Sequence, residues 1–130
     1  MKAVTIPKWL KLPANSTITG ISPDSEVEHA VRTKAAPPSV NILFSGIMHY
    51  RDASTPGLPT RPVSVAQSIW FTTPSGAAIF NAGITTWSCD LIQTCAYSTV
   101  NEASRATMAA VTNQILNLWQ TKAVGKTLHN

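Results

Sequence analysis

Charged residues are scarce in this sequence: only 12% of its 130 residues are Asp, Glu, Lys or Arg. An average soluble domain has about twice that share. The formal net charge is +4, but five of the six lysines are divided between the two ends of the chain, and the lysines form no basic stripe with interleaved aromatic residues. We therefore expect no nucleic-acid partner. The scarcity fits two interpretations, a simple low-charge domain or a piece of a larger protein with one face covered by other sequence.

Long apolar runs are also absent. No stretch approaches the roughly 20 apolar residues that a transmembrane helix needs. The first residues do not form the apolar region of a signal peptide, because Pro7, Lys8 and Lys11 interrupt them. The sequence thus predicts no membrane partner and no targeting segment in this chain, and it leaves the cellular compartment undetermined.

Cysteine and histidine are too few and too dispersed to indicate a metal site. The two cysteines, Cys89 and Cys95, do not have the spacing of a CxxC motif, and the three histidines are scattered. A disulfide in an oxidising compartment and two buried free thiols are equally compatible with this spacing. The GxSxG, GxGxxG, HExxH and phosphate-binding loop motifs are absent as well.

The most informative stretch is 67–91, which predicts a β-hairpin. Apolar runs at 69–71 and 77–80 flank a Pro-Ser-Gly turn. Gly83 then permits a positive φ or a close backbone approach. Beyond it, Thr86 and its neighbours surround Trp87 with hydroxyl groups, just past a strand end where open α/β sheets keep their binding crevices.

Trp87 has two interpretations. It is either a half-exposed pocket wall or ordinary core, packed under the final helix against Ile115 or Trp119. We expect the half-exposed position, because several hydroxyl-bearing residues flank the indole. Trp87 and Thr86 are therefore candidate substrate-binding residues.

The rest of the chain adds one strand, one long loop and one helix. Residues 40–44 predict a strand, and residues 45–62 predict an irregular segment in which His49 is a third candidate substrate-binding residue. Thr99 and Glu102 form a capping box that begins an amphipathic helix. Its apolar residues recur at helical spacing and are Met108, Val111, Ile115, Leu118 and Trp119, the last expected in the core.

These residues resemble a known family. The stretch TTPSGAAIFNAGITTW, a nearby cysteine and the final helix are similar to the C-terminal region of the N,N-dimethylformamidase large-subunit family. Upstream, Gly20 and Asp24 match the Gly and Asp of the family's Gly-x-Glu-x-Asp run, whereas Ser22 stands at the Glu position. The resemblance spans about residues 9–122, which correspond to the final part of much longer proteins.

The resemblance implies a class I glutamine-amidotransferase-like fold and amidohydrolase chemistry. The family's enzyme is similar to iron-dependent amidohydrolases whose two tyrosine ligands and one glutamate lie upstream of the matched region. Neither Tyr50 nor Tyr97 falls in a matching motif, so the chain itself is expected to hold no metal or other cofactor. Asp24 is the one candidate catalytic residue, and the alternative interpretation, which is the more common one, is that it caps a turn.

We therefore expect a single α/β domain over residues 1–130, a partial flavodoxin-like, amidotransferase-like three-layer sheet with a β-hairpin and a C-terminal amphipathic helix. It would hydrolyse small C–N amides only when completed by upstream sequence. The alternative is a non-catalytic binding or interaction module. The expected partners are the upstream domain of the same protein or a second copy, since unpaired strand edges invite association.

Overall fold

The chain folds into one sheet with two helices. The computed structural model describes residues 1–13, 15–21, 27–31, 37, 39–50, 61–95 and 98–121. The strands are β1 (Lys2–Ala3), β2 (Asn41–Tyr50), β3 (Arg61–Thr72) and β4 (Ala78–Asn81), and the helices are α1 (Trp87–Leu91) and α2 (Glu102–Thr121). The candidate catalytic residue Asp24 lies outside the described residues.

The four strands form an antiparallel sheet in the order β1-β2-β3-β4. Along β3, burial alternates with the period of two that the pleat imposes. The residues on its inner face are buried, and they are Ala66, Ser68, Trp70 and Thr72. The predicted β3–β4 hairpin and the strand beginning near residue 40 are thereby confirmed.

The expectation of an irregular segment over 45–62 is wrong at both of its ends. β2 continues to Tyr50, and β3 begins at Arg61, where the two residues pair. The physical reason is that β3 supplies hydrogen-bonding partners from a distant part of the chain, which a local reading of Ser45 and Gly46 cannot detect.

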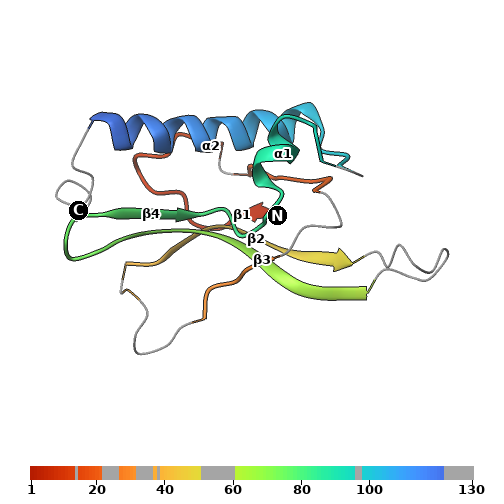
Figure 1. Ribbon diagram of the computed structural model, residues 1–130, viewed down its shortest axis with the longest axis horizontal. Coiled ribbons are helices and arrows are strands. Elements are labelled where there is room, and N and C mark those ends of the chain that lie inside the picture. Colours follow the sequence, from red (N-terminus) through yellow and green to blue (C-terminus); the bar gives the residue numbers. More distant parts are fainter. Residues whose placement is uncertain are drawn as a thin grey trace.

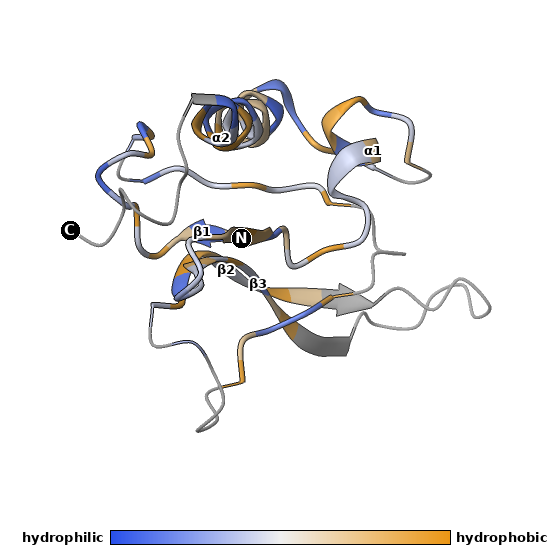
Figure 2. Ribbon diagram, turned by 60° about the vertical axis from the view of Figure 1, so that its left-hand side comes forward, coloured by the Kyte–Doolittle hydropathy of each residue, from blue (hydrophilic) through white to orange (hydrophobic). Residues whose placement is uncertain are grey.

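Both helices lie on the same side of the sheet (Figures 1 and 2). The structure confirms the mixed α/β class. Every strand pair in the described sheet is antiparallel, whereas a doubly wound flavodoxin-like sheet has parallel strands with helices on both faces. The flavodoxin-like, three-layer part of the expectation is therefore not confirmed.

Helix α2 provides most of the helical side of the core. Met108, Val111 and Ile115 are buried at helical spacing, as predicted. Two details differ from expectation. The N-cap is Asn101, whose Oδ1 accepts a hydrogen bond from the Ser104 backbone N–H at 2.8 Å, so Thr99 is not the cap. Trp119 remains 43% exposed rather than entering the core.

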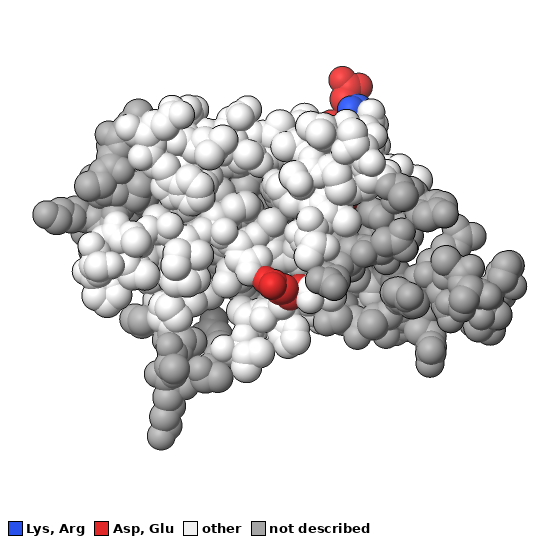
Figure 3. Space-filling model, in the orientation of Figure 1, with Lys and Arg blue, Asp and Glu red and all other residues white. Residues whose placement is uncertain are grey.

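Charged side chains are sparse on the face of the molecule that Figure 3 draws. The face drawn in Figure 3 has acidic side chains near its centre and a small charged group at its upper edge, and its other described side chains are uncharged. Within the described part of the chain, no helix has the length and apolar character needed to cross a bilayer.

Candidate functional site

The predicted site residues do not converge on one place. Thr86 and Trp87 lie together at the start of α1. His49 is near the end of β2, where its backbone pairs with Pro62, and its side chain is not described. Because Asp24 is outside the described residues, the structure brings together only the two candidates that are already adjacent in sequence.

Between β4 and α1, the backbone at Gly83 passes very close to the backbone of β3. Its φ is +76°, and a Cβ placed there would lie 2.3 Å from the backbone oxygen of Gln67 in β3. The Gly83 N–H donates to Asn81 Oδ1 at 2.7 Å, and the Ser68 hydroxyl donates to the Ala82 carbonyl at 2.6 Å. Both reasons for glycine that the sequence suggested, positive φ and close approach, therefore hold at this position.

Trp87 is part of the core, so the expectation of a half-exposed side chain is wrong. Only 8% of the residue is exposed. Its indole N–H donates to the Thr112 hydroxyl of α2 at 3.1 Å, and its ring packs edge-to-face with Phe80 of β4 at a centroid distance of 5.7 Å. The side chain thus joins α2 to the sheet. The role of Trp87 in substrate binding stays a prediction. Its burial favours an indirect role over direct contact with a substrate.

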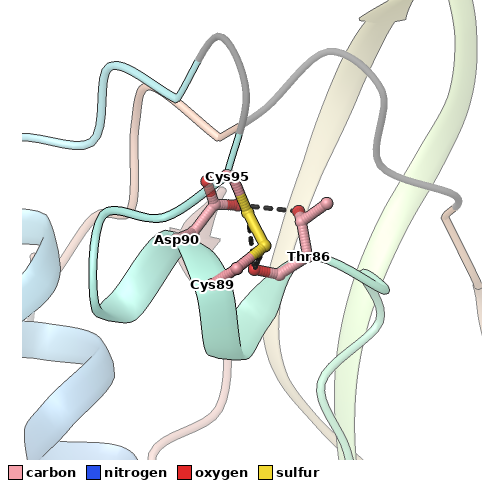
Figure 4. The surroundings of a disulfide bond; sticks show 4 residues. All are labelled: Thr86, Cys89, Asp90 and Cys95. Carbon is pink, nitrogen blue, oxygen red and sulfur yellow. Dashed lines mark hydrogen bonds between the residues drawn. A yellow bond between two sulfur atoms is a disulfide. The ribbon is translucent and has the colours of Figure 1, made fainter.

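Thr86 holds a buried carboxylate (Figure 4). Its hydroxyl donates to Asp90 Oδ2 at 2.7 Å, while the Asp90 backbone N–H donates to the Thr86 carbonyl at 2.8 Å. Asp90 is fully buried. Sequence reasoning missed this residue, although a hydroxyl and a carboxylate four positions apart is a recognisable helical pair. Its burial makes it a positioning group for α1.

A disulfide closes the same segment. Cys89 and Cys95 are bonded, with Cα atoms 5.0 Å apart, which resolves the two alternatives left open by their spacing. The two sulfurs lie 3.4 and 3.5 Å from the Thr86 carbonyl oxygen (Figure 4). Bonded sulfurs have no proton to donate, so we interpret these distances as packing contacts that fix the end of the loop onto α1.

Removing this disulfide should destabilise the protein moderately. We expect the double variant Cys89→Ala, Cys95→Ala to lose about 2–3 kcal/mol of unfolding free energy, because the closed loop is short and constrains the unfolded chain only modestly. Urea titration of both proteins measures the loss, and reductant should reproduce it in the native sequence without affecting the variant. Two titratable thiols in the unfolded, non-reduced protein would contradict the bonded state.

The resembled enzymes hold iron with two tyrosines and a glutamate, and the side chains of Tyr50 and Tyr97 lie outside the described part of this chain. No three side chains of His, Cys, Asp or Glu gather within the described part of the chain. Its cysteines are bonded to each other, and Asp90 is engaged with Thr86. We therefore derive no chemical step through a metal on this chain.

Comparisons with protein-family models, curated proteins and solved structures found no match to this chain. Its function has to be argued from its residues and their arrangement.

Proposed function

We propose that the chain is the C-terminal segment of an amidotransferase-like domain from a dimethylformamidase-like amidohydrolase. In that domain it would complete a flavodoxin-like, three-layer arrangement and take part in hydrolysis of small C–N amides only together with upstream sequence. The order of its motifs supports this: strand, Ser-Gly turn, strand, Gly83, Trp87 and final helix. These elements also form one packed unit, since Trp87 contacts both β4 and α2.

The observation that carries the proposal is the apolar outer face of the sheet, opposite the helices. Val65, Ile69 and Phe71 alternate with the buried residues of β3 and so point to this face. Ile47 pairs with Val65, and Ile79 pairs with Phe71, which places them there too. Ile47 is 63% exposed, and Val65 and Ile79 are exposed as well.

Such a face is unusual for a sheet side in contact with water. Antiparallel sheets with one solvated face normally alternate apolar and polar residues, with the polar residues outward. Among the described side chains, the outward positions of three neighbouring strands are apolar except for Ser45, Gln67 and Asn81, and exposed apolar surface of this kind marks interaction sites. A third layer supplied by the rest of an amidohydrolase domain would cover these residues.

Within this proposal, the chain contributes support and one acid rather than a complete active site. Asp24 would act as the proton shuttle. Thr86 and Trp87 would support one wall of the substrate pocket, with His49 as a further contact. Because Trp87 is buried, its contribution would be to hold α1 in place.

The proposal predicts that the isolated chain hydrolyses neither formamide nor acetamide above background. The same chain completed with the sequence encoded upstream of Met1 should hydrolyse a small amide, and Asp24→Asn should lower kcat by about 10²-fold or more, as expected for loss of a general acid or base. Turnover is measured by release of ammonia from primary amides, or of the corresponding amine from N-substituted ones. Two results would contradict the proposal. One is turnover by the isolated, iron-loaded chain, and the other is inactivity of the completed protein when it is folded and loaded with iron.

The alternative is a non-catalytic interaction module that uses the same apolar face, around Ile47 and Val65, to bind a second copy. The unpaired edge strands of the sheet would assist this self-association, since exposed edges accept further strands. Sedimentation and metal content separate the two functions. A completed protein that contains iron and turns over an amide supports the enzyme, whereas a metal-free chain that self-associates and is inactive when completed supports the module.

A further inference from the structure

A hollow of about 360 Å³ lies at the end of the sheet opposite the β2–β3 connection. Residues of the N-terminal segment and the adjoining ends of β2 and β3 surround it, where Asn41 pairs with Trp70. The residues that define its character are Lys8, Trp9, Ser39, Asn41, Trp70 and Thr72. Small-ligand sites occupy about 300–1,000 Å³, so this hollow has room for a small ligand.

Two indoles form its apolar wall. The ring centroids of Trp9 and Trp70 are 4.7 Å apart, with a tilt of 53°. Behind them, Trp119 stacks on Trp70 at 6.4 Å and 21°. Trp70 is only 2% exposed, so packing holds it firmly and little side-chain entropy remains to be lost when a ligand binds.

Three polar groups beside this wall have no hydrogen-bond partner in the described part of the chain. The indole N–H of Trp70, the hydroxyl of Thr72 and the side-chain oxygen of Asn41 make no hydrogen bond to any residue in the described part of the chain. Their neighbours are engaged: the Ser39 hydroxyl donates to the Thr72 carbonyl at 2.9 Å, and Asn41 Nδ2 donates to the Ser39 carbonyl at 2.8 Å. The hollow therefore offers one donor, one acceptor and one hydroxyl at fixed positions.

We propose that this hollow binds a neutral ring that carries hydroxyl groups, such as one or two sugar rings. The C–H face of such a ring suits the apolar surface of the half-buried Trp9 indole, and its hydroxyls match the three unengaged polar groups. Among the described residues no carboxylate lines the hollow, which argues against a cationic ligand, and the side chain of Lys8 is exposed to solvent. This site lies apart from α1, so it is independent of the proposed amide chemistry.

Titration of the full chain with neutral disaccharides tests the proposal. Cellobiose, lactose and N,N′-diacetylchitobiose are added up to about 10 mM, since small sites of this kind bind with Kd near 1 mM or below. The indole N–H signal of Trp70 in ¹⁵N-resolved NMR spectra is expected to shift with at least one of them. Trp9→Ala should weaken that binding about tenfold or more, and Thr72→Val about fivefold, the size of one hydrogen bond.

Matched variants distinguish binding from general damage. Ile92→Ala removes an exposed side chain that does not line the hollow, and its Kd should stay within about twofold of the native value. Thr72→Val keeps the side-chain shape, so it remains informative if Trp9→Ala fails to fold. Three results would overturn the proposal: no shift with any of the sugars, equal affinity in Thr72→Val and the native chain, or binding of indole without binding of sugar.

Discussion

Truncation of Trp87 to alanine is expected to lower the free energy of unfolding by about 3–5 kcal/mol, the range for large aromatic residues in a core. The change removes the edge-to-face contact with Phe80 and opens a cavity between β4 and α2. It also leaves the Thr112 hydroxyl without the indole donor, although that hydroxyl still donates to the Met108 carbonyl at 2.9 Å.

Denaturant unfolding of Trp87→Ala and of Trp119→Ala provides the comparison. Trp119 is an equally large residue of the same type, but it is 43% exposed, so its loss should cost about 1 kcal/mol or less. Equal, small losses for both variants would contradict the core position of Trp87. Such a result would support the half-exposed position that the hydroxyl groups next to Trp87 in the sequence suggest.

Substitution of Gly83 by alanine should be of similar severity, about 3–5 kcal/mol. Two costs add at this position. An alanine at φ +76° bears the penalty of the left-handed region, about 1–2 kcal/mol. Its Cβ would also lie 2.3 Å from the Gln67 backbone oxygen, so either β3 or the chain entering α1 has to move. The atoms that the new Cβ would meet belong to the backbone, which cannot move aside as easily as the end of a flexible side chain.

Gly76→Ala is the matched control for this prediction. Gly76 has a φ of +90° in the turn between β3 and β4, so alanine there bears the conformational penalty at a turn rather than against the backbone of β3. Its expected loss is about 1–2 kcal/mol. Midpoints of chemical denaturation measure both variants. If Gly83→Ala loses no more than Gly76→Ala, the close approach to β3 is not a constraint.

Much of the candidate site could not be predicted because its partners come from distant segments. The hydroxyls next to Trp87 in sequence suggested exposure, but the decisive hydroxyl belongs to Thr112, 25 positions away on α2. The same holds for the hollow at Trp9 and Trp70, which is assembled from three separate segments. Neither tryptophan has a local pattern that marks it as part of a binding surface.

The sequence by itself determined the features whose neighbours in space are also neighbours along the chain. It predicted the β3–β4 hairpin from a turn and two apolar runs, the glycine at residue 83, and the buried face of α2 from its 3.6-residue period. Only the tertiary structure decided the extension of β2 to Tyr50, the burial of Trp87, the bond between the cysteines and the apolar outer face of the sheet. The strand extension, the burial of Trp87 and the outer face depend on contacts between segments that the backbone brings together only on folding, and local propensity carries no information about such contacts. The two cysteines are only six positions apart, but their spacing fits a disulfide and two free thiols equally well.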